Sequence, residues 1–282
     1  MSRTLVALHA HPDDEASKGA ATVSRYVDEG VRAVLVTATG GEAGEILNPA
    51  MDREEVKSDL KAVREAELMA SAGVIGFHRV ELLGYRDSGM PDMPDNANPE
   101  AFVNASFEEA LEKVVRIIRE ERPQVLLGYD DHVRYPHPDH LRIRDLGIAA
   151  FEAAADGNRF VDSGDPWQVS RLYAPVFTVA RLYALHNAVL DSGLESPFIE
   201  WLERLDDDSQ EREAERTLMR VKVAGTLERG REALRAHRTQ VDPEGFWFQV
   251  PLSVVLEAYP YEDFELLASV APVAAHHEDL FD

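Results

Sequence analysis

The chain has 282 residues, a net charge of −23 at pH 7 and 45% hydrophobic residues, which is long enough for one large α/β domain with a substantial core. The negative charge argues against binding to the phosphates of nucleic acid and against binding to an anionic membrane surface. Cysteine is absent, which excludes disulfides, thiolate nucleophiles, Fe–S clusters and thiolate zinc sites. Any metal ion must therefore be held by His, Asp and Glu.

The sequence contains no run of about 18 or more apolar residues, so no transmembrane helix is predicted. The N-terminus leads directly into a strand-like segment, without the basic region and long apolar region of a secretory signal. We therefore expect a soluble, cytoplasmic protein.

The first 155 residues alternate strand-like and helix-like segments, which predicts an α/β fold with a mostly parallel sheet and helices on both faces. In chain order, we expect strands over 3–10, 31–39, 79–84 and 124–130, and helices over 16–30, 53–72, 106–122 and 138–156. Gly30 is suited to the end of the first helix and Pro123 stops the third. Pro138, with an acid beside it, is typical of a helix start.

Beyond residue 156 the alternation weakens. We expect strands near 170–179 and 216–223, a helix near 225–238, and irregular structure around the apolar segment GFWFQVPLSVV (245–255). No linker rich in Gly, Pro or Ser separates the two halves. We predict a single domain over 1–282, in which 1–155 form the core and 156–282 form a C-terminal elaboration that completes the pocket. The segment 245–255 could be core or interface, so a homo-oligomer stays open.

Two clusters of histidines and acids each follow a predicted strand. HAHPDDE (9–15) follows the first strand, and DDHVRYPHPDH (130–140) follows the fourth. Because ligands of open parallel sheets bind at the carboxyl ends of the strands, we expect the two clusters to meet. Together they offer enough nitrogen and oxygen ligands for a zinc-type ion with an open coordination position.

Several of these residues also have an interpretation without catalytic function. His9 could pack against the strand, Asp13 could cap the following helix, and His132 could be a surface loop residue. The pattern occurs twice, as HPDD and HPDH, and each copy leaves a strand and enters a helix. This repetition favours a metal site over coincidence.

These residue types point to metal-assisted hydrolysis of an amide or ester. Two neutral imidazoles and one carboxylate on a divalent ion lower the pKa of bound water towards neutrality. A neighbouring carboxylate can take the proton of that water. A histidine or tyrosine nearby can stabilise the oxyanion and help the leaving amine to depart.

AHPDDE near the N-terminus and HPDH at residue 140 resemble the PIG-L/LmbE family of zinc-dependent N-acetylglucosaminyl deacetylases. The resemblance covers the region to about residue 155 and continues at ALRAHRTQVDPEG (233–245). It implies a Rossmann-like fold and a hydrolase that cleaves the amide bond of an N-acylated glucosamine conjugate, a small amino-sugar molecule. The activity it favours is that of a mycothiol S-conjugate amidase, with an N-acetylglucosaminyl-inositol deacetylase as the alternative.

The resemblance also implies roles for residues of the two motifs. His11, Asp14 and His140 would bind Zn2+, and Fe2+ is possible because His and Asp ligands accept both ions. The implied catalytic residues are the general base Asp13, the histidine His137 that stabilises the tetrahedral intermediate, Asp139 that orients it, and Tyr135 that reaches the oxyanion.

Substrate contacts are implied at further positions of the chain. Arg64 and Asp87 would hold sugar or inositol hydroxyls, and His237 would lie near the site. Lys18, in DEASKG, favours the amidase over the deacetylase, although a solvated helix lysine explains it equally well. Glu42 and Glu45, in TGGEAGE, are expected to line the pocket.

One departure from the family pattern leaves the acyl group and the aglycone open, because Val133 and Arg134 stand where glycines are usual. Two other classes of function also stay open. A nucleotide-binding domain would use TGGEAGE (39–45) as its phosphate loop, but this loop lacks the G-x-G-x-x-G spacing. A non-catalytic sugar-binding protein would bind metal without hydrolysis. A serine hydrolase is disfavoured because no G-x-S-x-G motif occurs.

Overall fold

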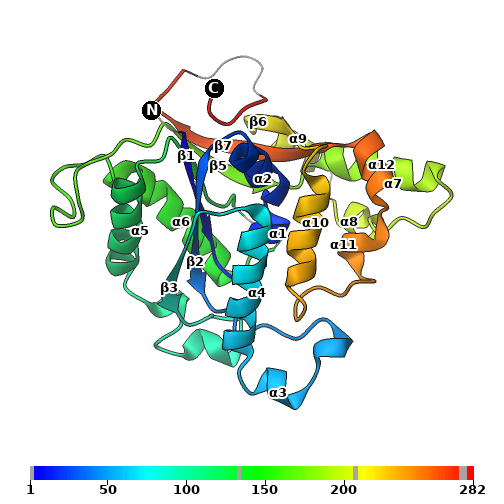
Figure 1. Cartoon of the computed structure of the whole chain (residues 1–282), viewed down its shortest axis with the longest axis horizontal. Coiled ribbons are helices and arrows are strands. Elements are labelled where there is room, and N and C mark those ends of the chain that lie inside the picture. The colour runs from blue at the N-terminus through cyan, green and yellow to red at the C-terminus, as the bar shows by residue number, and fades with distance from the viewer. Residues whose placement is uncertain (1–2, 132–134, 206–208, 273–277) are drawn as a thin grey trace.

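The computed structural model describes residues 3–131, 135–205, 209–272 and 278–282. A seven-stranded sheet with the order β3-β2-β1-β4-β5-β7-β6 forms its centre (Figure 1). The strands are β1 (Thr4–His9), β2 (Arg32–Thr39), β3 (Arg79–Tyr85), β4 (Val125–Leu127), β5 (Arg171–Val176), β6 (Leu218–Lys222) and β7 (Tyr261–Ser269). The strands β1 to β5 pair in parallel and β7 pairs antiparallel with β5 and β6. The predicted mostly parallel α/β sheet is confirmed.

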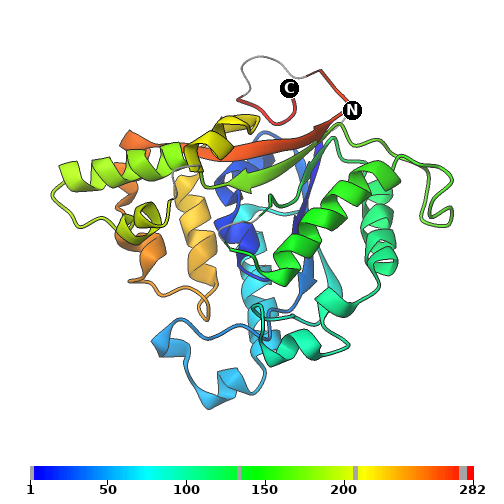
Figure 2. The same cartoon turned by 180° about the vertical axis from the view of Figure 1, so that it is seen from behind.

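Helices cover both faces of this sheet, as the views from front and back show (Figures 1 and 2). The α-helices are α1 (Asp14–Ser17), α2 (Ala20–Asp28), α3 (Glu54–Lys57), α4 (Leu60–Ile75), α5 (Phe107–Glu121), α6 (Pro138–Ala153), α7 (Val179–Asp191), α8 (Ile199–Glu203), α9 (Ser209–Ala214), α10 (Leu227–Ala236), α11 (Phe246–Gln249) and α12 (Leu252–Ala258). The described residues also form the short 3-10 helices η1 (Pro49–Met51), η2 (Pro94–Ala97) and η3 (Phe102–Asn104). None of the helices in the described ranges has the length and apolarity needed to span a membrane.

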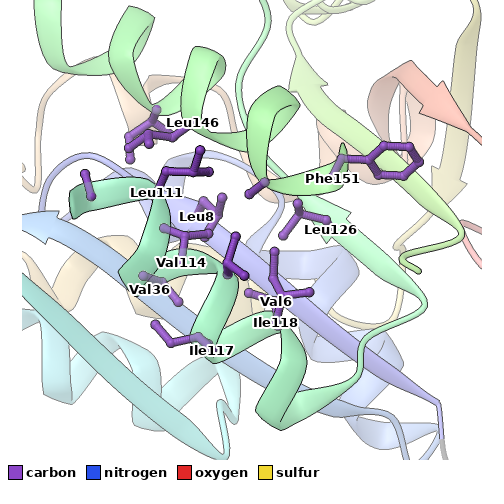
Figure 3. Packing of buried hydrophobic residues seen from close by; sticks show 14 of the residues in the cluster. Val6, Leu8, Val36, Leu111, Val114, Ile117, Ile118, Leu126, Leu146 and Phe151 are labelled. Atoms are coloured by element: carbon purple, nitrogen blue, oxygen red, sulfur yellow. The ribbon is translucent and has the colours of Figure 1, made fainter. Parts of the chain in front are cut away.

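The central strands are apolar on both sides because both faces of the sheet are covered. In β1 every residue is buried. Val6 and Leu8 face α5 and α6, where they join the cluster of Figure 3. Leu5 and Ala7 face the opposite layer, which includes α2 and α10. This two-sided packing holds the carboxyl ends of the strands in place, and the histidine- and acid-rich loops leave from there.

Two predicted helices are each broken into two. The helix expected over 16–30 divides at Gly19, whose φ of +92° is a conformation that side-chain-bearing residues rarely adopt. The helix expected over 53–72 divides at Asp59, whose carboxylate accepts a hydrogen bond from the Ala62 amide and starts α4. The first break separates α1, which carries Asp14 and Glu15 of the first cluster, from α2.

The C-terminal half contains elements that the sequence did not predict. Helix α7 begins just after the Thr178 hydroxyl, which accepts from the Arg181 amide, so the strand expected over 170–179 ends early. Strand β7 lies between β5 and β6, and β6 forms one edge of the sheet. The segment expected to be irregular, 245–255, forms α11 and the first half of α12.

Candidate metal centre and active site

The two acid- and histidine-rich clusters lie together at the carboxyl edge of the sheet. Strands β1 and β4 are adjacent and parallel, with Ala7 opposite Leu127, so their following loops leave at the same edge. The second loop enters α6 at Pro138, which places His140 in its first turn. The structure brings His140 Nε2 within 3.3 Å of His11 Nδ1.

Three ligand atoms form a triangle that fits a divalent ion. Besides the distance between the two histidines, Asp14 Oδ2 lies 3.4 Å from His140 Nε2 and 3.5 Å from His11 Nδ1. A tetrahedral zinc ion with bonds of about 2.0–2.1 Å separates its ligands by about 3.4 Å. All three side chains are buried, and they form one of the groups whose donor atoms converge closely enough to hold a metal. These residues therefore suit a divalent metal ion, and all three line the cavity described below.

The charges around His11 reinforce this interpretation. His11 Nε2 lies 3.2 Å from Asp139 Oδ2 and 3.5 Å from Asp87 Oδ1. Burial opposes the charged imidazole, yet the carboxylates of Asp139, Asp14 and Asp87 raise the pKa of His11 well above its ordinary value. A cluster of buried carboxylates favours a positive charge at this point. Hydrogen bonding at Nε2 also leaves Nδ1 available to the ion.

Asp139 supports the site differently from the role that the resemblance implied. Its carboxylate contacts His11 and accepts from the Ser88 amide at 3.0 Å and from the Ser88 hydroxyl. His137 instead receives the backbone N–H of Asp139 on its Nδ1, at 3.2 Å. Asp139 therefore positions His11 through its side chain and His137 through its main chain.

Replacing Ser88 with alanine is expected to weaken metal binding about 10–100-fold, because Asp139 loses the hydroxyl that orients it towards His11. A chelator competition titration of the purified protein measures this change. Ser24→Ala is the matched control, since Ser24 is also buried but donates to the Ile75 carbonyl. Equal affinity in Ser88→Ala and Ser24→Ala would show that the Ser88 contact contributes nothing to the site.

Asp13 precedes α1, but its side chain forms no capping hydrogen bond. The residue has φ +109°, and its carboxylate accepts from Arg64 Nη2 at 3.0 Å. Burial raises the pKa of the Asp13 carboxyl above its ordinary value, against the opposing positive charge of Arg64. A carboxylate with a raised pKa, on the cavity wall, is suited to accept a proton.

Arg64 anchors the surrounding loops. It is 3% exposed, and it donates to the carbonyls of Pro12 at 2.6 Å and Gly41 at 2.5 Å. A Cβ atom at Gly41 or Gly44 would collide with its guanidinium group. The glycines of TGGEAGE thus make room for the Arg64 side chain. This role explains why the loop contains glycines without assuming that it binds phosphate.

His137 and Tyr135 present hydrogen-bond donors to the same cavity. Burial lowers the pKa of His137 to about 4, so the ring is neutral at pH 7. Because Nδ1 accepts a hydrogen bond, the proton of the neutral ring is on Nε2. Tyr135 is 51% exposed and its ring lies 6.0 Å from that of His137. The departures at Val133 and Arg134, and also His132, lie outside the described residues.

A cavity of about 730 Å3 opens beside the cluster. One part of its wall belongs to residues 11–140, including Lys18, Glu45 and Asp87, and the other part to residues 175–263. Lys18 Nζ lies 2.5 Å from Asp14 Oδ1, so Lys18 is an ion-pair partner of a metal-site residue rather than a solvated lysine. The C-terminal half therefore contributes a large part of the cavity wall.

Comparison with known proteins identifies the family. The model of the PIG-L family, GlcNAc-PI de-N-acetylase, matches residues 6–151. The chain belongs to the PIG-L family. It is 42% identical to the mycothiol S-conjugate amidase of Streptomyces coelicolor, over 98% of this chain and 96% of that protein.

A second relative agrees with this PIG-L membership, and a solved structure shares the fold. A 1D-myo-inositol 2-acetamido-2-deoxy-alpha-D-glucopyranoside deacetylase of Frankia alni is 38% identical, over 86% of each chain. The solved N,N'-diacetylchitobiose deacetylase of Pyrococcus horikoshii shares the fold, with a TM-score of 0.62 at 17% identity, over 94% of this chain and 84% of that one. The family resemblance drawn from the two motifs is confirmed.

The remaining predicted substrate residues of this PIG-L chain differ in whether they line the cavity. Arg64, Asp87 and Glu45 line the cavity, whereas Glu42 and His237 lie outside its lining. His237 is 0% exposed, with Nε2 2.5 Å from Glu15 Oε1. The structure therefore places the His237 ring behind Glu15, outside the cavity lining.

Several supporting residues were missed by the sequence analysis. Glu15 accepts from the Ser71 hydroxyl at 2.5 Å and from the Asp13 amide at 3.0 Å, which connects His237 to the loop that carries the site. Glu15 belongs to the first motif, so its position was a signal, but its partners are far away in the sequence. His9 is buried and lies 3.1 Å from the Tyr129 hydroxyl, in agreement with its interpretation as a packed residue.

Proposed function

We propose that this protein is a metal-dependent hydrolase that cleaves the amide bond of mycothiol S-conjugates. The observation that carries the proposal is the triangle of His11, Asp14 and His140 beside Asp13 and His137 at one cavity. The similarity to the Streptomyces coelicolor amidase over almost the whole chain supports the substrate class.

The ion that we propose for the triangle is Zn2+, with Fe2+ as the alternative. A divalent ion held by His11, Asp14 and His140 supplies Lewis-acid activation of the attacking water and of the substrate carbonyl. The rest of the chemistry is assigned to side chains of the chain.

Asp13 acts as the general base. It takes a proton from the attacking water while the water oxygen bonds to the amide carbon. The carbon–nitrogen bond then breaks, and the same proton passes from Asp13 to the leaving amine. The products are a carboxylic acid and a free amino sugar, so no further reactant is needed.

His137 and Tyr135 stabilise the oxyanion. The neutral His137 ring carries its proton on Nε2, and the Tyr135 hydroxyl is on the same cavity wall. Both can donate to the carbonyl oxygen as negative charge develops there, which lowers the barrier to attack. Arg64 positions Asp13 by holding both its carboxylate and the adjacent Pro12 carbonyl.

The size of the cavity favours the amidase over the deacetylase. Small-molecule pockets range over about 300–1,000 Å3, and this one has a volume of about 730 Å3. An acetyl group leaves much of that space empty, whereas a substituted cysteinyl group needs room on the acyl side of the amide. Lys18, Glu45 and Asp87 offer polar contacts for the hydroxyls of the amino-sugar conjugate.

A comparison of two substrates tests the proposal. We expect kcat/KM of the purified, metal-loaded enzyme to be at least about tenfold higher for a mycothiol S-conjugate than for N-acetylglucosaminyl-inositol, which corresponds to about 1.4 kcal/mol of transition-state stabilisation. The reverse order would assign the deacetylase activity instead. Cleavage of neither substrate, with metal bound, would favour the non-catalytic sugar-binding protein.

A further inference from the structure

The cavity has an aromatic wall that the proposed mechanism does not use. Phe177, Trp201 and Trp247 line the same cavity as His11 and Asp14. We infer that this wall, together with Arg181, is the subsite for the group bonded to the substrate sulfur, and that it selects aromatic S-substituents. This inference rests on the proposed function and names the part of the substrate that the enzyme discriminates.

The topology of the sheet places the aromatic wall beside the metal centre. Strand β5 is the neighbour of β4 on the side away from β1, and Phe177 follows β5 directly. Trp201 comes from α8 and Trp247 from α11, which lie with α7 and α12 at the end of the molecule opposite α5 (Figure 1). The cavity therefore runs from the ends of β1 and β4 along the sheet edge to the aromatic side chains.

The rings form a continuous series. The Phe177 and Trp201 ring centroids lie 6.1 Å apart. Trp201 stacks on Phe246 at 5.6 Å and 8°, and Phe246 meets Trp247 edge-on at 5.5 Å. Distances of this size are typical of favourable aromatic pairs, which hold the rings in defined orientations. A ligand meets a preformed aromatic surface here.

An apolar cluster packs against the aromatic rings on the side away from the cavity and keeps them in place. Phe177 and Phe246 pack against this cluster, which contains Leu182, Leu185, Val189, Phe198, Val250 and Tyr259. Trp201 and Trp247 nevertheless remain 41% and 40% exposed. Large apolar side chains that are supported from one side and exposed to a cavity on the other are typical of ligand recognition.

Arg181 adds a preference for π-rich groups. Its guanidinium carbon lies 4.3 Å from the centre of the Phe177 ring, and the side chain lines the cavity. Among the described residues, the buried Nε atom of Arg181 has no hydrogen-bond partner. A cation between an aromatic ring and a cavity attracts the face of a further aromatic group.

The chemistry of the substrate decides whether its sugar or its S-substituent binds at the aromatic wall. Sugar hydroxyls that lose water on binding need hydrogen-bond partners close to the scissile amide. The polar wall with Asp87, Glu45 and Lys18 can satisfy those hydroxyls. Because the sulfur is on the acyl side of the amide and the sugar on the amine side, the S-substituent is left for the aromatic wall.

The experiment compares S-benzyl and S-methyl mycothiol as substrates of the metal-loaded, full-length enzyme. We expect kcat/KM to favour the benzyl conjugate by at least about tenfold in the wild type, and this preference to fall about tenfold in Trp201→Ala and in Trp247→Ala. Trp201→Phe should restore most of the preference. Tyr183→Ala is the control, since Tyr183 is 42% exposed on α7 but does not line this cavity.

Thermal melting accompanies each variant, so that a loss of fold is separated from a loss of selectivity. If Trp201→Ala does not fold, then Trp247→Ala and Trp201→Phe carry the test. An unchanged benzyl-to-methyl preference in the folded tryptophan variants would overturn the aromatic subsite and leave the amidase activity intact. If the wild type cleaved neither conjugate, the proposed function would fall and this inference with it.

Discussion

Asp13→Asn is expected to lower kcat by about 10²–10⁴-fold while the divalent ion stays bound. General-base catalysis typically contributes a factor of this size, and an amide oxygen in place of the carboxylate cannot accept the proton of the attacking water. The metal ligands are unchanged, because Asp14 follows Asp13 but projects its own carboxylate towards His11 and His140. Single-turnover kinetics together with the metal content of the same sample measures both expectations.

Asparagine is the appropriate substitution because of the backbone at this position. Residue 13 has φ +109°, and asparagine tolerates positive φ better than most residues with a side chain. Its amide oxygen can still accept the bond from Arg64 Nη2, so the loop should keep its conformation. An Asp13→Ala variant would lose both the general base and the hydrogen bond from Arg64, so the two effects could not be told apart.

The control for this experiment is Asp28→Asn, an acid that pairs with Arg229 on the exposed surface of α2. It should turn over substrate like the wild type. Full activity in Asp13→Asn would remove Asp13 from the role of base. Loss of the ion together with activity would instead make Asp13 part of the metal site.

Local sequence patterns were sufficient to predict the parallel half of the sheet. Strands β1 and β2 and helix α5 each carry their own signal, because an apolar run or an amphipathic stripe is a property of neighbouring residues. Strand β7 carries no such signal. It contains Glu262, Asp263 and Glu265. The buried Asp263 accepts hydrogen bonds from Thr178 and Tyr259, which lie outside the strand.

The difference between local sequence signals and contacts formed only in the folded chain also applies to the site. The meeting of the two clusters was predictable because each motif contributes residues close together in sequence, and adjacent parallel strands bring two such loops together. The choice of His11, Asp14 and His140 within the clusters came from the family resemblance. The contact of Ser88 with Asp139 spans 51 residues, and that of His237 with Glu15 spans 222. Their partners are determined by tertiary packing, which no local spacing records. The aromatic wall was missed for the same reason, since α8 and α11 meet only in the folded chain.

Removal of one metal ligand is expected to abolish both metal binding and turnover. His140→Ala should lose the bound divalent ion and, with it, turnover, because two remaining ligands do not complete the tetrahedral set. His11→Ala and Asp14→Ala should behave alike, since each removes one corner of the triangle. Elemental analysis of the purified variants measures the ion directly, and substrate cleavage is assayed in parallel.

Thermal unfolding provides a readout that does not depend on activity. An ion that binds only the folded state stabilises it by about 2.7 kcal/mol at a free concentration 100 times its dissociation constant. Added Zn2+ should therefore raise the Tm of the wild type but leave that of His140→Ala unchanged. His186→Ala should respond like the wild type, because His186 bonds to the Ser196 hydroxyl and lies outside the cavity lining. A zinc-dependent Tm in His140→Ala would place the ion on other ligands, and the roles of Asp13 and His137 would then have to be derived from a different centre.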